Sequence, residues 1–452
     1  MNNQIDRRNF ISSSAAAGAG FMIANSAIAQ SEGKKDINIA LIGAGVQGQV
    51  LMNAILKLGK NSGIKFRAVC DIWEKGNLRR VSRILTAYKR YGHKGTAYVD
   101  YQEMLDKETD LDAVLIATPD FWHARHTIAC FEKGLHVYCE KEMSNSIEDA
   151  KSMVLAGRKA GKLLQIGHQR RSNPRYIYCH DKIINEANLL NRITNISGQW
   201  HRSRAACVDL GWAKGSDIPN ETLKKYGFDD MSQFRNWRWY KGKGGGPIVD
   251  LGSHQIDVYS WFLGNALPSS VMASGGVDYW KDHEWYDNAI AIFEFPTEKG
   301  LVRASYETLT TNSSNGYYEL FMGDEGTLLI SESAGRGEIY RESWVEESKW
   351  DPSVQKGLVT LEKASIKAET KAGDDEVDVR ESATPALYRM PIEMKDPYHQ
   401  PHLVNFFESV RGNQKLNCPG EIGYETAVMV LKVNEAIAAG QKIELKPEDF
   451  KV

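Results

Sequence analysis

Short, continuous apolar runs alternate with amphipathic stretches along the chain from residue 36 to residue 168. Uninterrupted apolar runs of this length are typical of strands buried on both faces of a parallel sheet. The stretches between them repeat their apolar positions with helical spacing. The expected strands are residues 37–42, 66–70, 112–117, 136–139 and 163–167. The pattern therefore predicts an α/β domain with a doubly wound parallel sheet over residues 36–168.

The pattern changes after about residue 170, where separate strand-like runs are divided by hairpin-type turns. These runs predict a second α/β domain, residues 169–400, whose mostly antiparallel sheet keeps one face open. Two amphipathic helices, residues 401–410 and 421–439, follow, and we expect the segment 401–452 to pack back on the first domain. The expected elements of the second domain are strands at 192–200, 271–277, 289–295, 301–306, 317–322 and 327–330 and a helix at about 248–263.

The first 30 residues differ from the rest of the chain. Arg7-Arg8 precedes a weakly apolar stretch rich in Ala, Gly and Ser, and Ala27-Ile28-Ala29 provides a small-residue cleavage pattern. The stretch is too short and too interrupted to serve as a permanent membrane anchor. We interpret residues 1–29 as a twin-arginine signal peptide that directs the protein to the periplasm. A disordered basic tail is the alternative interpretation.

Composition narrows the range of partners. The 452 residues carry a formal charge of −2, which gives no reason to expect nucleic acid or an anionic membrane as a partner. The six cysteines include no C-x-x-C pair, so we interpret them as packed thiols rather than as a disulfide framework or a zinc site. The candidate chemistry therefore has to come from motifs that follow the expected strands.

A glycine motif, G-x-G-x-x-G, follows the first expected strand and opens an amphipathic helix. This order of strand, glycines and helix predicts a dinucleotide site, because the helix N-terminus faces the pyrophosphate. Asp71 ends the second strand about twenty residues later, where an acid binds the ribose 2′-hydroxyl. Such an acid repels a 2′-phosphate, so NAD is favoured over NADP. The alternative is a glycine-rich turn without a ligand. The motif residues are Gly43, Ala44, Gly45, Val46, Gln47 and Gly48.

Two further segments end parallel strands and are expected in the same crevice. Thr118-Pro119 ends one strand, and His123 lies on the helix that follows. Glu140-Lys141 ends the next strand, where charged residues are unusual unless they are paired. We expect all of these residues to contact the cofactor, and Lys141 also to stabilise a developing alkoxide. An ordinary turn and a surface ion pair are the alternatives.

A third segment, GGGPIVDLGSHQID at residues 244–257, places Asp250 and His254 four residues apart, on one helical face. A histidine near a carboxylate is a natural general base for a hydroxyl proton. A metal site formed by Asp250, His254 and Asp257 is the alternative, but nothing nearby supplies a convincing fourth ligand. We therefore predict no metal.

In this order, the segments GAGVQG, ATPDFWHA, CEKEMS and GGGPIVDLGSHQID resemble the glucose–fructose oxidoreductase/inositol dehydrogenase/MocA (Gfo/Idh/MocA) superfamily. The resemblance implies a Rossmann domain, an open-faced α/β domain whose sheet often forms a homo-oligomer interface, and hydride transfer with bound NAD or NADP. By position, Lys141 matches the lysine of the family's Glu-Lys-Pro motif, and Asp250 and His254 match its aspartate and histidine. Glu142 replaces the usual proline, and because a non-proline cis bond costs about 2.5–4 kcal/mol we expect a trans peptide there.

The function predicted from the sequence is an exported NAD(P)-dependent oxidoreductase acting on a secondary hydroxyl of a sugar or glycoside. His254 would accept the hydroxyl proton, Lys141 would polarise the oxygen, and Asp250 would hold the substrate or orient His254. Free nicotinamide cofactor should be scarce outside the cytoplasm, so the cofactor would be tightly held and recycled. The expected substrate-binding residues are Trp237, Trp239, Tyr240 and His201.

Two alternative functions remain open at this point. One is an NAD-dependent glycosidase, in which transient oxidation at C3 allows elimination of the leaving group. The other is a sugar-binding sensor that has kept the fold and performs no hydride transfer.

Overall fold

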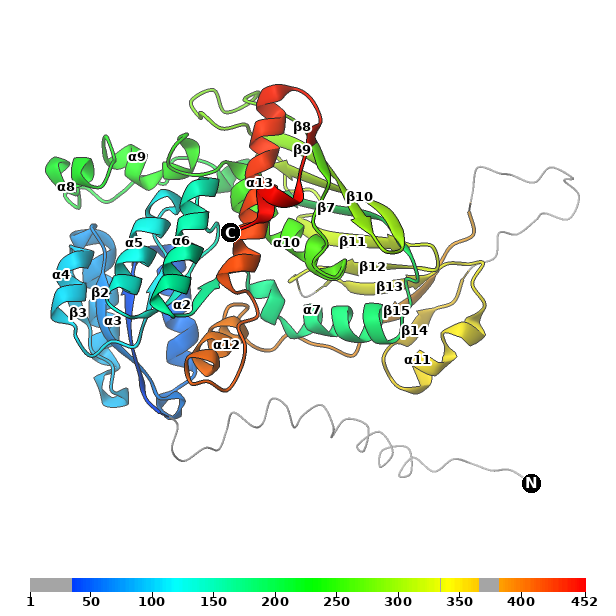
Figure 1. The fold of residues 1–452 in the computed structure, drawn as a ribbon, viewed down its shortest axis with the longest axis horizontal. Helices are drawn as coiled ribbons and strands as arrows, with labels where there is room; N and C mark the ends of the chain where they lie inside the picture. Colours follow the sequence, from blue (N-terminus) through cyan, green and yellow to red (C-terminus); the bar gives the residue numbers. More distant parts are fainter. Residues whose placement is uncertain (1–34, 334, 366–381) are drawn as a thin grey trace, which may run out of the picture.

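The computed structural model describes residues 35–333, 335–365 and 382–452 (Figure 1). The predicted signal peptide, residues 1–29, lies outside these ranges. No helix in the described part of the chain combines the length and the apolar character needed to cross a bilayer. Two domains lie side by side, with the α13 helix running between them (Figure 1).

The first domain is built on a parallel sheet that the described residues form with the order β3-β2-β1-β4-β5-β6. After β1 the chain continues to β2 on one side of the sheet, and after β4 it continues to β5 on the other side. The crevice between the carboxyl ends of β1 and β4 is therefore the natural place for a ligand. The strands are β1 (Ile37–Ile42), β2 (Ile64–Cys70), β3 (Thr96–Tyr98), β4 (Ala113–Ile116), β5 (His136–Cys139) and β6 (Leu164–Ile166). The helices are α2 (Val46–Lys57), α3 (Arg79–Ala87), α4 (Tyr101–Lys107), α5 (Asp120–Glu132) and α6 (Ile147–Ala160). The predicted doubly wound parallel sheet is confirmed.

The second domain is built on a ten-stranded sheet within the described residues, in the order β14-β15-β13-β12-β11-β7-β10-β9-β8-β16. Only the β7–β10 pair is parallel, so the predicted mostly antiparallel sheet is also confirmed. The strands are β7 (Ile193–His201), β8 (Ser270–Gly276), β9 (Asn288–Thr297), β10 (Gly300–Leu309), β11 (Tyr317–Gly323), β12 (Gly326–Ile330), β13 (Gly337–Arg341), β14 (Thr360–Lys363), β15 (Ala386–Arg389) and β16 (Ile443–Glu444).

One face of this sheet packs against helices, and the other keeps apolar side chains partly exposed. The covering helices are α10 (Ser253–Phe262) and α13 (Gly420–Ala439), which contact β7, β8 and β10. On the uncovered face, Met272 is 48% exposed and Ile290 is 49% exposed. The alternation of buried and exposed residues along β9 is the pattern expected of a sheet with one open face.

The C-terminal helices connect the two domains. Helix α12 (Gln400–Val410) packs on α2, and its Leu403 and Phe406 join the apolar core on that side of the Rossmann sheet. Helix α13 packs on both α6 and α10, so the core of the second domain continues into the first. At Gly423 an added Cβ would lie 2.4 Å from Ile166, which shows how closely α13 approaches β6.

Residues 202–245, here called the aromatic insertion, leave the second domain and cover the carboxyl edge of the first. The insertion carries α8 (Asn220–Lys225) and α9 (Met231–Arg235), which lie over the Rossmann domain (Figure 1). Its apolar residues pack on Trp73 and Trp122 of the first domain. The indole N–H of Trp122 donates to the carbonyl oxygen of Tyr226 at 2.9 Å. The insertion therefore forms a roof over the crevice.

Candidate active site

The glycine motif shapes a cradle at the end of β1. Gly43 has a φ of +93°, and an added Cβ would lie 2.5 Å from the carbonyl oxygen of Ala117. An added Cβ on Gly48 would lie 1.9 Å from the carbonyl oxygen of Gly43. No side chain can therefore fill the space between this loop and β4, and the N-terminus of α2 stays open toward the crevice.

Asp71 lies at the far end of this cradle. Its carboxylate accepts hydrogen bonds from the backbone N–H groups of Ala44 at 2.8 Å and Trp73 at 2.7 Å. Burial raises the pKa of Asp71, and these hydrogen bonds oppose that effect. A cavity of about 340 Å³ runs from Asp71 past Gly45 to Lys141. The open glycine loop, the helix N-terminus and an acid at the end of β2 together fit a bound dinucleotide.

The structure separates the predicted cofactor residues into two groups. Ala44 and Gly48 are buried in the turn itself, and His123 is buried behind it. The ring nitrogens of His123 lie 2.8 Å from the carbonyl oxygens of Thr118 and Glu142, so this side chain joins two loops and does not face the cleft as expected. The predicted residues that line the cleft are Gly43, Gly45, Val46, Gln47, Asp71, Thr118, Pro119, Glu140 and Lys141.

Lys141 and Asp250 meet where the two domains face each other. The Nζ atom of Lys141 lies 3.1 Å from Oδ1 of Asp250, and Nε of Arg238 lies 3.2 Å from Oδ2. Burial alone would raise the pKa of Asp250, but Lys141 and Arg238 outweigh it and hold that pKa well below its usual value. Asp250 is therefore a buried carboxylate that is ion-paired with both Lys141 and Arg238.

His254 lies in the first turn of helix α10, which follows a π-helical turn at Ile248–Gly252 that contains Asp250. The ring is only 6% exposed, and among the described residues its Nδ1 has no hydrogen-bond partner. Burial, with Lys141 as a further cause, lowers the pKa of His254 well below the usual value, so the ring is neutral. The described contacts include no hydrogen bond from Asp250 to His254, because the Asp250 carboxylate bonds Lys141 and Arg238.

The expected trans peptide between Lys141 and Glu142 is wrong, because the structure has a cis peptide there. Glu142 turns inward and is fully buried. Its carboxylate accepts a hydrogen bond from the N–H of Met143 at 2.7 Å, and burial raises the pKa of Glu142 to about 8. The substitution of proline by glutamate thus leaves Lys141 beside Asp250.

A second cavity, of about 410 Å³, adjoins the cofactor cleft and is lined by His254 and Asp250. Its wall includes Trp200 and Tyr317, whose rings stack at 4.6 Å with an interplanar angle of 19°. Glu332 and Gln169 provide polar groups beside these rings. None of these four residues was predicted from the sequence, because strand aromatics and isolated polar residues look like ordinary sheet residues.

The predicted substrate residues have different positions in the structure. Trp239 lines the second cavity, whereas Trp237 lines the cofactor cleft. Tyr240 and His201 are absent from the linings of both cavities, contrary to expectation. The imidazole of His201 instead lies 2.8 Å from the Glu307 carboxylate.

The alternative metal trio does not assemble. Asp257 is fully buried, and its carboxylate accepts a hydrogen bond from Arg171 at 2.8 Å. Within the described ranges, no group of three His, Cys, Asp or Glu side chains could hold a metal ion.

Comparison with known proteins identifies this two-domain arrangement. Residues 37–168 match an oxidoreductase family's NAD-binding Rossmann fold, and residues 222–445 match the same family's C-terminal alpha/beta domain. The chain belongs to the Gfo/Idh/MocA oxidoreductase family. The glycine cradle lies within the domain that matches the family's NAD-binding fold, and the predicted cofactor, NAD, is confirmed.

Individual relatives in the Gfo/Idh/MocA family are distant. D-glucoside 3-dehydrogenase of Escherichia coli is 27% identical over 52% of this chain and 57% of its own length. A glycosyl hydrolase family 109 protein of Shewanella baltica is 24% identical over 77% of this chain and 80% of its own length. The chain spans about half the length of the first curated relatives it matches, between 43% and 57%. A levoglucosan dehydrogenase structure in complex with NADH has the same fold, with a TM-score of 0.65 and 16% identity over 91% of this chain and all of the other.

We predict that NAD(H) binds this Gfo/Idh/MocA enzyme at least about tenfold more tightly than NADP(H), because Asp71 would face the 2′-phosphate. The neighbouring Ile72 carries no charge, and Lys75 donates to the carbonyl oxygen of Gly215 in the aromatic insertion. Calorimetry with both cofactors measures the ratio. The Asp71→Asn variant is the matched control, and in it the ratio of NAD(H) affinity to NADP(H) affinity should be smaller. Tighter binding of NADP(H) by the parent protein would contradict the prediction.

Proposed function

We propose that the enzyme oxidises a secondary hydroxyl of a sugar or glycoside by hydride transfer to NAD. The observation that supports this most strongly is that the cofactor cleft and the second cavity share Lys141, Glu140 and Arg238 in their linings. A substrate in the second cavity would therefore meet the cofactor at Lys141. Relatives named D-glucoside 3-dehydrogenase and levoglucosan dehydrogenase favour a carbohydrate substrate.

Each side chain has a defined part in this proposal. Bound NAD supplies the hydride acceptor, at C4 of its nicotinamide. His254 accepts the hydroxyl proton, since its ring is neutral and lines the second cavity. Lys141 donates a hydrogen bond to the same oxygen and stabilises the charge that develops there. The stacked rings of Trp200 and Tyr317 offer an apolar surface to one face of a sugar.

Single-turnover reduction of NAD bound to the purified protein tests this function. A panel of glucosides and free sugars is added, and absorbance of the reduced nicotinamide is followed. We expect reduction with at least one class of carbohydrate and a keto sugar as the product. If every carbohydrate binds without reducing NAD, the protein is a sensor and the proposal fails.

Glycoside cleavage is a second candidate function, favoured by the match to the glycosyl hydrolase family 109 protein over 80% of that protein. In this reaction, oxidation at C3 makes the C2 hydrogen acidic, the leaving group is eliminated, and the later steps return the hydride. The reaction is redox-neutral, so it needs no external oxidant. Mass spectrometry of the products distinguishes the two: a free sugar with an intact aglycone indicates cleavage, and a keto glycoside indicates net oxidation.

Export by the twin-arginine route is part of the proposal and requires a firmly held cofactor. The aromatic insertion supports this, because Tyr226, Phe228 and Trp237 add side chains to the cofactor cleft. Additional contacts hold the insertion down: Lys225 pairs with Asp100 at 2.6 Å. A dinucleotide under this roof would be shielded from exchange, and native mass spectrometry of purified protein should detect it.

Replacement of Arg7-Arg8 by Lys-Lys should leave the protein in the cytoplasm, since the export machinery reads the arginine pair. Cell fractionation measures the change, with the parent sequence as the control. An unchanged periplasmic yield would show that residues 1–29 do not act as a twin-arginine signal.

Self-association through the open sheet face is the final part of the proposal. Met272 pairs across strands with Ile292 on that face, and Met272 is 48% exposed. Exposed apolar sheet faces of this kind favour an interface with a second copy. Light scattering should give a mass above that of a monomer, and a monomer at micromolar concentration would contradict this.

A further inference from the structure

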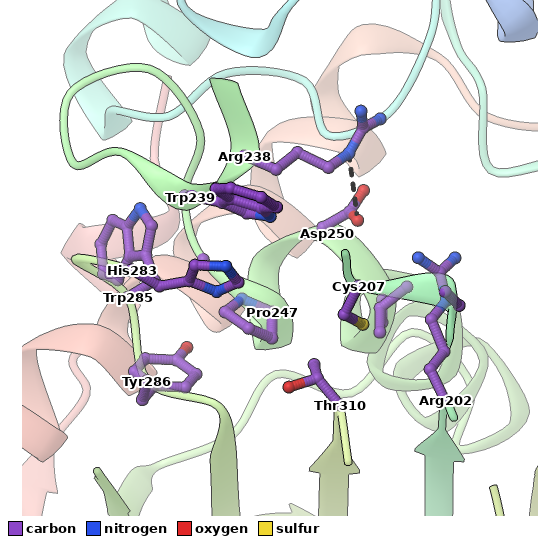
Figure 2. Close-up of a pocket in the computed structure, with 14 residues that line it drawn as sticks. Arg202, Cys207, Arg238, Trp239, Pro247, Asp250, His283, Trp285, Tyr286 and Thr310 are labelled. Atoms are coloured by element: carbon purple, nitrogen blue, oxygen red, sulfur yellow. Dashed lines mark ion pairs between the residues drawn. The ribbon is translucent and has the colours of Figure 1, made fainter. Parts of the chain in front are cut away.

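A third, smaller cavity of about 100 Å³ adjoins the second cavity beside Asp250 (Figure 2). We call it the side chamber. Arg202, Arg238 and Asp250 line both the side chamber and the second cavity, so the two are contiguous. The steps proposed above make no use of this space.

Stacked rings form one wall of the side chamber. Trp239 lies over His283 with ring centroids 4.0 Å apart and an interplanar angle of 24°. Trp280 also stacks on His283, at 5.3 Å and 12°. Figure 2 shows Trp239 and His283 on one side of the chamber, with Pro247 beside them and Thr310 below. Such a wall is flat and apolar, and it is suited to stacking against another flat ring.

Most polar atoms around the side chamber already have partners inside the protein. The indole N–H of Trp285 donates to the carbonyl oxygen of Gly244 at 3.1 Å, and the hydroxyl of Tyr286 donates to Asn434 at 2.8 Å. The hydroxyl of Thr310 donates to the carbonyl oxygen of Asp287 at 3.0 Å. Nε2 of His283 is shielded from solvent and has no partner among the described residues, and the charged residues Arg202, Arg238 and Asp250 lie where the chamber joins the second cavity.

We propose that the side chamber binds the planar, single-ring aromatic aglycone of a glycoside substrate. This inference rests on the proposed function and specifies its substrate class. A planar aromatic ring stacks face to face on the flat wall of Trp239 and His283 more completely than a puckered sugar ring does.

Size and position agree with this occupant. An apolar cavity of about 150 Å³ holds benzene, so a chamber of about 100 Å³ that opens into the second cavity has room for no more than one ring. The chamber begins at Asp250, whose carboxylate lies 3.1 Å from Lys141 Nζ. A ring in the chamber would therefore be attached directly to the sugar that reacts at Lys141.

The test compares phenyl and methyl glycosides of one sugar, together with the corresponding disaccharide. We expect kcat/KM from NAD reduction or product release to be about ten- to a hundredfold higher for the phenyl glycoside than for the other two. Thr310→Phe fills the chamber from a residue that does not line the second cavity, and it should bring the phenyl-to-methyl ratio close to one. Thr310→Val also lacks the hydroxyl but leaves the space open, so it should keep the parent ratio.

The outcomes separate this inference from the proposed function. Turnover with equal kcat/KM for phenyl and methyl glycosides, or a preference for the disaccharide, overturns the side chamber as an aglycone site and leaves the oxidoreductase proposal standing. Absence of turnover with every compound overturns the proposed function. Calorimetry then still tests whether the side chamber binds an aromatic aglycone. Phenyl glycoside must bind more tightly than methyl glycoside to the parent protein, and the two must bind with equal affinity to Thr310→Phe.

Discussion

His254→Ala should lower single-turnover reduction of bound NAD by about 10²–10⁴, the usual contribution of a positioned general base. The neutral ring lies at the wall of the second cavity, in contact with Trp200, where it can accept a proton. Alanine removes that acceptor and leaves no other group in its place. NAD should bind the variant as it binds the parent, because the cradle at Gly43, Gly45 and Asp71 belongs to the other domain.

A matched control for this variant is His201→Ala. His201 bonds Glu307 and lines neither cavity, so its removal should leave the rate within a few-fold of the parent. The pH profile gives a second test. The pKa of His254 is lowered by burial, so the base stays active as pH falls through 6.5, and the acid limb of the parent profile should lie well below that value. If His254→Ala reduces NAD as fast as the parent, proton abstraction belongs to another group, with His399 at the cavity edge the next candidate.

The first domain was largely predictable because its strands are buried on both faces. β4 is a continuous apolar run, and β1 and β5 are apolar apart from Asn38 and His136, which is the pattern of buried parallel strands between helices. β3 (Thr96–Tyr98) was missed for the converse reason: it is a short edge strand with exposed side chains, so no apolar run marks it. The glycine cradle was also predictable, because a side chain on Gly43 or Gly48 would clash with the neighbouring backbone.

The second cavity was less predictable because its residues come from distant strands and loops. Tyr317 and Glu332 lie more than a hundred positions after Trp200 along the chain, and pairing of β7 with β11 brings the two aromatics together. One local signal did exist in the run Gln169-Arg170-Arg171, directly after β6. Arg170 is 1% exposed and bonds the buried carboxylates of Glu319 and Glu332, and cations are buried in this way only with partners.

His123 shows where a motif-based assignment fails. Its position after Thr118-Pro119 suggested a cofactor contact, but the helix turns the ring inward, where it joins the backbone of two loops. The residue still serves the site, because those loops carry Thr118 and Lys141. The sequence position of His123 correctly placed it near the cofactor cleft. The direction of its side chain, which the sequence does not reveal, determines that it supports the loops and does not line the cleft.

Lys141→Met should lower turnover by about 10²–10³, the effect of removing one donor to a developing oxyanion. Methionine is unbranched like lysine, one atom shorter, and cannot donate a hydrogen bond, so it removes the donor with little change in the shape of the cavity. We expect kcat to fall more than KM rises, because the interaction strengthens as charge develops on the oxygen. Steady-state kinetics with the best carbohydrate substrate measures both parameters, and calorimetry checks that NAD still binds.

Arg238→Met separates donation to the substrate from simple support of Asp250. Lys141 and Arg238 each pair with one oxygen of the Asp250 carboxylate, so each variant leaves Asp250 with one cation. If Lys141 acts only by holding Asp250, the two variants should lose kcat alike. If Lys141 donates to the reacting oxygen, Lys141→Met should lose at least about tenfold more kcat than Arg238→Met. A Lys141→Met enzyme whose kcat matches the parent and whose KM alone rises would restrict Lys141 to substrate binding and contradict its proposed role.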